Sequence, residues 1–164
     1  MTAQPNFELL PTTEQDRTYI ARLNFLTDVF GAEDGQLSDS FAEDFDFYVR
    51  HWDPNEGGLI AWADLVPAGG VWLLWGSSAE RGVGFVDESM PELAIAVEPR
   101  FRGTGLASLL LDGATKLAQK IGAPGISLAV AYANEKALKV YEHKGFAVVG
   151  ENDEKTYQIM EKRF

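Results

Sequence analysis

The segment that decides the fold of this 164-residue chain is Arg100-Phe101-Arg102-Gly103-Thr104-Gly105-Leu106-Ala107. The residues before it, 92–97, are apolar on both faces, as in a central strand. The residues after it, 105–121, repeat leucine and alanine at helical spacing. Two glycines let the backbone turn tightly and point successive N–H groups outward, and a helix N-terminus adds partial positive charge. The loop therefore suits the oxygens of a phosphate group.

Three kinds of phosphate-binding loop compete for this segment. A Walker A loop needs Gly-x-x-x-x-Gly-Lys-Ser/Thr, which the sequence does not contain. A dinucleotide fingerprint needs glycine or alanine where Ser108 stands, and an acidic residue after the next strand, 126–131, where none follows. A nucleotide-dependent oxidoreductase is therefore a distant alternative. Arg102, Gly105 and Ala107 instead match the acyl-CoA pyrophosphate loop of the GNAT superfamily of N-acetyltransferases, which the segment closely resembles.

A second segment strengthens the resemblance. Residues 134–146 read Asn-Glu-Lys-Ala-Leu-Lys-Val-Tyr-Glu-His-Lys-Gly-Phe, similar to the family helix Asn-x-x-Ala-x-x-x-Tyr-x-x-x-Gly-Phe. Asn134 and Tyr141 lie on nearly one helical face, roughly 10 Å apart along the axis, so both can follow one extended ligand. The resemblance covers residues 92–146, a third of the chain, and we identify no family motif in the first 91 residues.

The order of the predicted elements is typical of an α/β domain with a mixed sheet. Strands are expected at 7–10, 59–65, 71–76, 92–97 and 126–131, with a final hairpin around Asn152 and Asp153. Helices are expected at 13–30, 41–52, 105–121 and 135–144. The first hairpin is expected to turn at 67–70, and 77–91 to form a long polar loop.

The resemblance implies the GNAT fold, in which helices flank a mixed central sheet of about six to seven strands. Residues 1–164 would form one N-acetyltransferase domain, with the acceptor side mainly in 13–91 and the acyl-CoA side mainly in 92–146.

Two aromatic-rich helical stripes in the first half are predicted to face the core because a surface helix must bury one face. Their members are Tyr19, Leu23, Leu26 and Phe30, and then Phe41, Phe45, Tyr48 and Trp52.

The resemblance also implies how acetyl-CoA, as cosubstrate, would be held without a metal. The strand before the loop would splay from its neighbour, and the pantetheine arm would pair with the backbone of Ile95 and Val97. The Val97 N–H would also stabilise the oxyanion of the reaction. Asn134 would bind the pantetheine arm, and Tyr141 would protonate the departing thiolate. The pyrophosphate would lie on Arg102, Gly103, Thr104, Gly105, Leu106, Ala107 and Ser108.

Simpler structural roles stand beside these functional ones. Asn134 is also a helix cap, a role compatible with ligand binding. Tyr141 at helical spacing is also typical of a core aromatic, and His143 is interpreted as structural because it lies in the last helical turn. Glu92 is the candidate general base, since an alkylammonium must lose a proton before it attacks, although many family members use a water chain instead. Burial would have to raise its pKa.

Composition narrows the function further. The net charge is −11, with −12 in residues 1–91 and +1 in residues 92–164, so nucleic acid is not an expected partner and an anionic ligand should bind the second half. The chain has no cysteine, which excludes a disulfide framework, thiolate metal sites and a cysteine nucleophile. The polar first residues and the short apolar runs predict neither a signal peptide nor a membrane span, and we expect a cytoplasmic protein.

The predicted acceptor side is acidic. Residues 28–56 contain nine carboxylates and one arginine, Arg50, which would steer a cationic acceptor, although much of this charge is typical of a solvated helix face. The favoured function is transfer of an acetyl group from acetyl-CoA to a primary amine of a small molecule or a protein, by direct attack. The alternative is a non-catalytic acyl-CoA-binding sensor of the same fold. The sequence leaves the acceptor, the acyl preference and a homodimer open.

Overall fold

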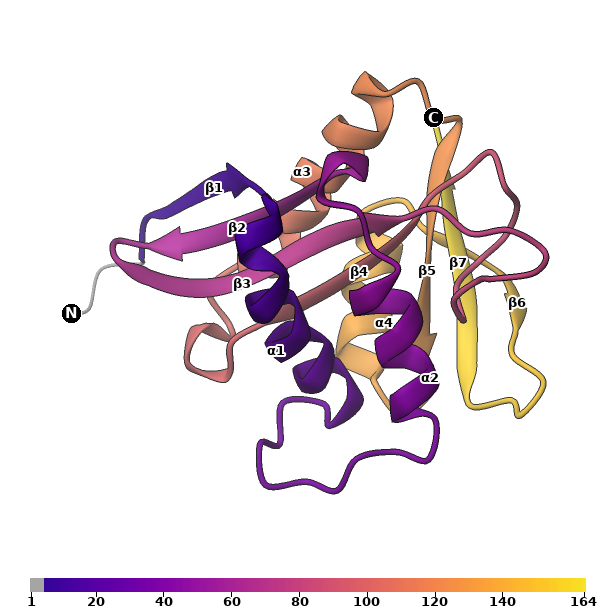
Figure 1. The fold of residues 1–164 in the computed structure, drawn as a ribbon, viewed down its shortest axis with the longest axis horizontal. Coiled ribbons are helices and arrows are strands. Elements are labelled where there is room, and N and C mark those ends of the chain that lie inside the picture. The colour runs from indigo at the N-terminus through magenta and orange to yellow at the C-terminus, as the bar shows by residue number, and fades with distance from the viewer. Residues whose placement is uncertain (1–4) are drawn as a thin grey trace.

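The computed structural model describes residues 5–164, which build one sheet with helices on both faces (Figure 1). The strands are β1 (Phe7–Pro11), β2 (Gly58–Ala63), β3 (Val66–Leu74), β4 (Glu92–Val97), β5 (Gly125–Ala131), β6 (Ala147–Glu151) and β7 (Tyr157–Arg163). The helices are α1 (Arg17–Asp28), α2 (Phe41–Phe45), α3 (Leu106–Lys120) and α4 (Glu135–His143). Short helical turns are η1 (Glu14–Asp16), η2 (Asp46–Arg50), η3 (Pro54–Glu56) and η4 (Pro99–Phe101). No helix in the described part of the chain combines the length and apolar character needed to cross a bilayer.

The seven strands form a mixed sheet in the order β1-β2-β3-β4-β5-β7-β6. Neighbouring strands are antiparallel except β4 and β5, which run parallel. Helices α1 and α2 cover one face, in front of the sheet in Figure 1, and α3 and α4 cover the other. The predicted α/β fold with a mixed sheet of six to seven strands is thus confirmed.

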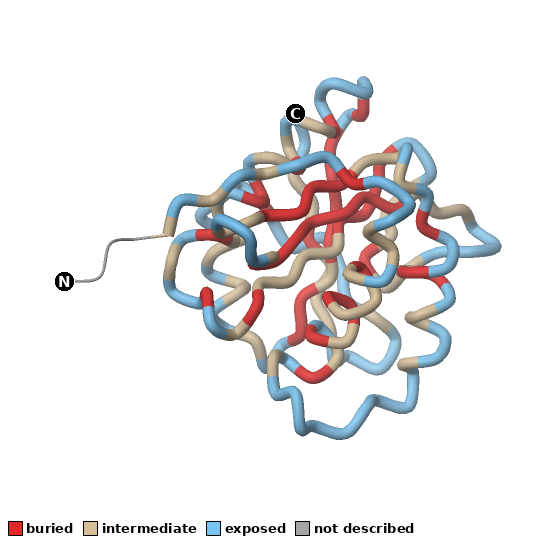
Figure 2. The backbone as a smooth tube through the Cα atoms, turned by 60° about the vertical axis from the view of Figure 1, so that its left-hand side comes forward, coloured by how far each residue is buried: buried red, intermediate tan, exposed pale blue. Residues whose placement is uncertain are grey.

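Each face of the sheet carries its own hydrophobic core. Successive side chains of β4 point to opposite faces, so that Leu93, Ile95 and Val97 pack toward α3 while Ala94 and Ala96 pack toward α1. Buried backbone gathers in the middle strands, whereas the connection between α1 and α2, residues 29–40, is largely exposed (Figure 2). The predicted central strand therefore lies between helices on both faces, and these helices come from different halves of the chain.

Strands β4 and β5 pair at one position only, Glu92 with Ser127, and part beyond it. The Glu98 N–H donates to the Ala68 carbonyl on the β3 side at 2.8 Å, and hydrogen-bonding directions alternate along a strand. The N–H groups of Ile95 and Val97 therefore point away from β3 and into the gap toward β5. Residues 94–97 are only half-buried although they lie in a central strand. The predicted splaying of this strand from its neighbour is confirmed.

The first hairpin turns at a different place from the one predicted. Residues 67–70 lie inside β3, and the chain reverses at Asp64, whose φ is +56°. A side chain at Gly69 would lie 2.6 Å from the Ala96 carbonyl oxygen, and one at Gly70 would lie 2.8 Å from Leu23. These glycines are therefore required by close packing against β4 and α1 and do not mark a turn.

The two aromatic stripes are only partly buried, contrary to the prediction. Helix α1 ends before Phe30, which has φ +53° and is 51% exposed. In the second stripe Trp52 is buried and Tyr48 is half-buried, and Phe47 and Val49 enter the core beside them. The second stripe is interrupted by η2, a π-helical turn that follows α2 and changes the angular spacing of the side chains.

Candidate active site

The loop after β4 presents a row of backbone N–H groups without acceptors. Gly103 and Gly105 have φ of +73° and +81°, in the left-handed region that favours glycine. The first bond of the following helix runs from Leu109 N–H to the Gly105 carbonyl at 3.2 Å. None of the N–H groups of residues 103–108 donates to any group within residues 5–164. Six consecutive donors therefore stand at the positive end of α3, which is the arrangement that binds phosphate oxygens.

Arg102 joins this loop to the segment that follows α1. Its Nη2 donates to the Phe30 carbonyl oxygen at 2.8 Å, and its guanidinium lies directly against Gly31. The side chain is exposed, so its other N–H groups face solvent beside the loop. Thr104 stabilises the loop from within, because its hydroxyl donates to the Phe101 carbonyl oxygen at 2.6 Å. Arg102 thus directly precedes the free N–H groups in the chain, and its guanidinium fixes the segment after α1.

Helix α4 carries the two other residues predicted to contact acetyl-CoA. Asn134 caps the helix, since its Oδ1 accepts from Ala137 N–H at 3.3 Å, and its amide N–H₂ group remains available to a ligand. Tyr141 packs edge-on against Phe146, with ring centroids 6.1 Å apart. Burial raises the pKa of Tyr141 to about 12, which keeps the phenol protonated at neutral pH. The helix begins just after β5 and packs on the α3 side of the sheet, so Tyr141 lies on the face opposite to Ala94 and Ala96.

Glu92 is buried on the α1 side of the sheet, with 3% of its surface exposed. Its Oε2 accepts from the Tyr48 hydroxyl at 2.5 Å and from Gly84 N–H at 3.1 Å. Its Oε1 is also buried and has no hydrogen-bond partner within residues 5–164. Burial raises the pKa of Glu92 to about 7, and the two hydrogen bonds oppose this shift. A carboxyl group with this pKa can take up and release a proton near neutral pH.

The long loop 77–91 covers this carboxylate. A side chain at Gly82 would lie 2.4 Å from both Glu92 Oε1 and the Tyr48 hydroxyl, and one at Gly84 would lie 2.6 Å from the backbone of β5 at Ala129. The backbone of the loop can reach the carboxylate only because both positions are glycine. A proton from solvent or substrate must therefore reach Oε1 through a water molecule or after movement of the loop.

Asp44 lies near two other carboxylates, Asp28 and Glu92, in the part of the chain predicted to bind the acceptor. Burial and then the negative charge of Asp44 on α2 raise the pKa of Glu92, and burial followed by the charges of Asp44 and Asp28 raises the pKa of Tyr157 on β7. Burial raises the pKa of Asp44 itself. Ser38 donates its backbone N–H to Asp28 at 2.9 Å, and so ties the exposed connection 29–40 to α1. The structure therefore places part of the predicted acidic acceptor side close to Glu92.

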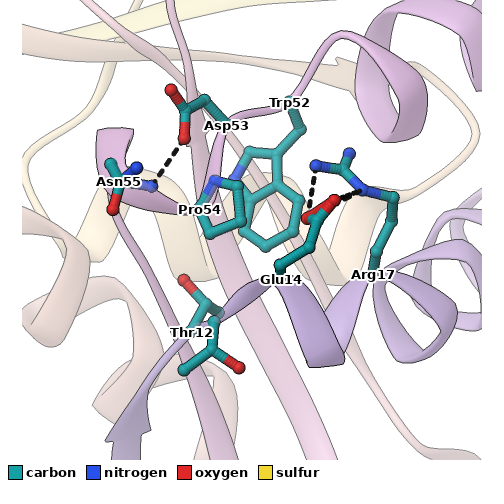
Figure 3. Close-up of a pocket in the computed structure, with 8 residues that line it drawn as sticks. Thr12, Glu14, Arg17, Trp52, Asp53, Pro54 and Asn55 are labelled. Atoms are coloured by element: carbon teal, nitrogen blue, oxygen red, sulfur yellow. Dashed lines mark hydrogen bonds and ion pairs between the residues drawn. The ribbon is translucent and has the colours of Figure 1, made fainter.

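Two surface hollows lie away from the residues predicted to act in catalysis or CoA binding. One, of about 430 Å³, lies at the start of α1, where Glu14 pairs with Arg17 at 2.7 Å and Arg17 stacks over Trp52 (Figure 3). The other, of about 490 Å³, lies where Arg22 binds Glu98 at 2.7 Å, next to η4. None of the residues predicted to act in catalysis or CoA binding lines either hollow.

The sequence patterns did not predict a role at the site for Tyr48, or for Gly82 and Gly84 in the loop 77–91. The stripe pattern predicts Tyr48 to be a core residue, whereas its hydroxyl has two partners that are distant in the chain, Glu92 at 44 positions and the Val83 N–H at 35 positions. The one available signal was the long polar loop containing Gly82 and Gly84, since loops of that length are often functional.

The chain is similar to several acetyltransferases. It is 28% identical to the spermidine N(1)-acetyltransferase of Escherichia coli K12 over 157 residues, 92% of this chain and 78% of that protein. It is 29% identical to the mycothiol acetyltransferase of Brachybacterium faecium over 62% of this chain, and it spans only 29% of the length of that relative.

Solved structures share the fold. The PaiA N-acetyltransferase of Thermoplasma acidophilum in complex with coenzyme A matches with a TM-score of 0.68 and 20% identity, over 97% of this chain and 99% of that one. The Vibrio cholerae spermidine N-acetyltransferase in complex with CoA and spermine matches with a TM-score of 0.64 and 22% identity, over 96% of this chain and 95% of that one. The sequence profile of the acetyltransferase (GNAT) family matches residues 24–146. Because that match spans three quarters of the sequence, this chain belongs to the GNAT acetyltransferase family.

Proposed function

We propose that this protein transfers an acetyl group from acetyl-CoA to a primary amine by direct attack. The observation that carries the proposal is the row of six free N–H groups, residues 103–108, which opens onto the gap between β4 and β5. A pyrophosphate can accept from these donors and a pantetheine arm can lie in the gap. The CoA-bound structure of the Thermoplasma acidophilum relative supports this assignment.

Within this proposal each CoA-binding residue has a distinct part. The backbone of residues 103–108 binds the pyrophosphate, and Arg102 adds positive charge beside it. The amide groups of the pantetheine arm pair with the free backbone groups of Val97, as a further strand would. Asn134 donates its N–H₂ group to the arm from the far side of the gap. The binding residues are therefore those inferred from the family motif.

The length of β4 argues for a different oxyanion donor from the one predicted. Glu92 and Val97 are five residues apart, about 16 Å along an extended strand, which is farther than a glutamate side chain reaches. Val97 is also the residue nearest the pyrophosphate loop, whereas the thioester lies at the other end of the arm. Ile95, about 10 Å from Glu92 along the strand, is the first residue beyond the β4–β5 pairing whose N–H points into the gap. We therefore assign the oxyanion to the Ile95 N–H and the arm to Val97.

Glu92 and Tyr141 would supply the base and the acid from opposite faces of the sheet. Glu92 Oε1 accepts a proton from the acceptor ammonium, through a water molecule or after movement of residues 82–84. The amine nitrogen then bonds to the acetyl carbon, and it loses its second proton to solvent as the carbon–sulfur bond breaks. The Tyr141 hydroxyl gives its proton to the departing sulfur, and the phenolate regains one from solvent.

The acceptor in this proposal is cationic. Asp44 lies close to Glu92 and Asp28 lies close to Asp44, and these carboxylates attract an amine with a second positive group. The E. coli and V. cholerae relatives named as spermidine N-acetyltransferases make polyamines the first acceptors to assay. A protein amine remains the second class in the assay.

The experiment begins with calorimetric titration of the protein with acetyl-CoA, CoA, ATP and NADH. We expect binding of the two CoA species alone, and its loss in Arg102→Glu. Thiol release is then measured with spermidine, putrescine, n-propylamine and a lysine peptide. Binding of CoA without transfer to any amine, and unchanged by Glu92→Gln and Tyr141→Phe, would favour the acyl-CoA sensor. Absence of CoA binding by the folded protein would refute both functions.

A further inference from the structure

Tyr48 fixes one oxygen of the Glu92 carboxylate and leaves the other free. The Tyr48 hydroxyl donates to Oε2 at 2.5 Å and accepts from Val83 N–H at 2.9 Å. Gly84 N–H donates to the same Oε2 at 3.1 Å. Oε1, in contrast, is buried and accepts from no group in the described part of the chain. Two donors therefore hold the carboxylate by one oxygen in a single orientation.

The backbone that carries Tyr48 is also fixed. Trp72, a fully buried residue of β3, donates its Nε1–H to the Tyr48 carbonyl oxygen at 2.9 Å. Tyr48 lies in the π-helical turn η2, and its ring packs edge-on against Phe47 with centroids 5.1 Å apart. The side chain is thus anchored to the sheet by its backbone and to the loop 77–91 by its hydroxyl. Such an arrangement keeps a donor in place while its partner changes charge.

We propose that Tyr48 is a positioning residue for acetyl transfer, which holds Glu92 by Oε2 so that Oε1 receives the proton of the acceptor amine. This inference rests on the proposed function of Glu92 as the base. In the step, an N–H bond of the ammonium breaks and an O–H bond forms at Oε1. Tyr48 keeps its own proton throughout, and its hydrogen bond to Oε2 is strongest while Glu92 is ionised.

The electrostatic surroundings fix the sign of the expected effect. The groups that act on the Glu92 charge are the Tyr48 hydroxyl from η2, the Gly84 N–H from the loop and the Asp44 carboxylate from α2. Burial and Asp44 raise the pKa of Glu92, whereas the two hydrogen bonds lower it. Removal of the Tyr48 hydroxyl therefore raises this pKa further, and Glu92 is ionised only at higher pH.

The test compares Tyr48→Phe with wild type in a direct titration of Glu92. Protein labelled with carbon-13 at the glutamate carboxyl is followed by NMR, and the Glu92 signal is identified by its absence in Glu92→Gln. We expect the Tyr48→Phe variant to titrate about one pH unit higher, because a hydrogen bond to a charged group is lost. The matched control is Tyr132→Phe, which removes a tyrosine–glutamate bond of 2.6 Å at the surface, to Glu151. This control should leave the Glu92 titration unchanged.

The same variants are then assayed with acetyl-CoA and spermidine from pH 5.5 to 9.5. The acidic limb of kcat/KM should move upward by the same amount in Tyr48→Phe, with about a tenfold loss near pH 6 and recovery toward the wild-type rate at pH 9. An equal loss at every pH would show a merely structural role and overturn the proposal, as would an unchanged Glu92 titration. A titration that moves while the acidic limb does not would refute Glu92 as the base and, with it, the positioning role. If spermidine is not acetylated, the proposed acceptor fails, and the NMR titration still decides whether Tyr48 controls Glu92.

Discussion

Substitution of Gly105 by alanine should separate the stability of the phosphate loop from its function. Gly105 has φ +81°, and a Cβ there would meet no atom within 4 Å, so the cost arises from backbone strain and not from a clash. A left-handed conformation costs an L-residue about 1–2 kcal/mol. For a chain of this size each kcal/mol lowers Tm by about 2–4 °C. We therefore expect Gly105→Ala to lower Tm by about 2–8 °C.

Gly122 provides the matched control for this substitution. It follows the other end of α3, has the same φ of +81°, and is equally free of neighbours. Gly122→Ala should therefore cost the same stability. In Gly105→Ala, relaxation of the strained loop should remove one N–H hydrogen bond to a charged phosphate oxygen, which reduces the free energy of CoA binding by about 1.5–3 kcal/mol. That loss weakens Kd roughly 10- to 150-fold in Gly105→Ala alone.

Circular dichroism melting and calorimetric titration with CoA measure the two effects in the same samples. Equal losses of Tm together with wild-type Kd values in both variants would refute the assignment of the pyrophosphate to residues 103–108. Weaker CoA binding in Gly122→Ala as well would show that strain anywhere in α3 affects the site. The assignment of the pyrophosphate to residues 103–108 is supported only if both variants lose equal stability and Gly105→Ala alone binds CoA more weakly.

Three further predictions concern the groups around the gap. Burial raises the folded-state pKa of Glu92 to about 7, so the wild type loses stability as Glu92 ionises between pH 5 and 8, whereas Glu92→Gln does not. The variant should therefore gain stability relative to wild type as the pH rises. The measurement is Tm against pH, and parallel curves for the two proteins would contradict the prediction. Tyr141→Phe should lower kcat about 100-fold at unchanged CoA affinity, since the phenol supplies the proton while its packing on Phe146 is retained; an unaltered rate of thiol release would remove its acid role. Asp44→Asn should raise KM for spermidine more than for n-propylamine, with the difference shrinking at high salt, and equal changes for both amines would exclude a second cationic subsite there.

The strongest sequence predictions concern local patterns. The loop glycines predicted a tight turn, which forms with left-handed residues at Gly103 and Gly105, and the apolar pattern predicted the bounds of α3 to within one residue. Asn134 was predicted as a cap and accepts from Ala137 N–H. Such features depend on neighbouring residues, so the sequence states them directly.

Predictions that required tertiary packing were weaker. Residues 67–70 look like a turn, but Gly69 and Gly70 serve the close approach of β3 to β4 and α1. Phe30 continues the helical stripe of α1 and yet lies exposed beyond its end. For the glycines the deciding partners are distant in the chain, whereas α1 is ended locally by the hydrogen bond from Gly31 N–H to the Leu26 carbonyl, and periodicity reports neither.

The sequence by itself determined that this chain has an α/β fold, a glycine loop between the central strand and the following helix, and an acidic N-terminal half. Tertiary structure alone decided that β4 and β5 part after a single pair, that the N–H groups of Ile95 and Val97 face the resulting gap, and that Tyr48 reaches Glu92 across 44 positions of the chain. The physical reason lies in the range of the forces. Backbone conformation and capping depend on adjacent residues, whereas burial, hydrogen-bond partners and the pKa of a buried carboxyl depend on groups that only folding brings together.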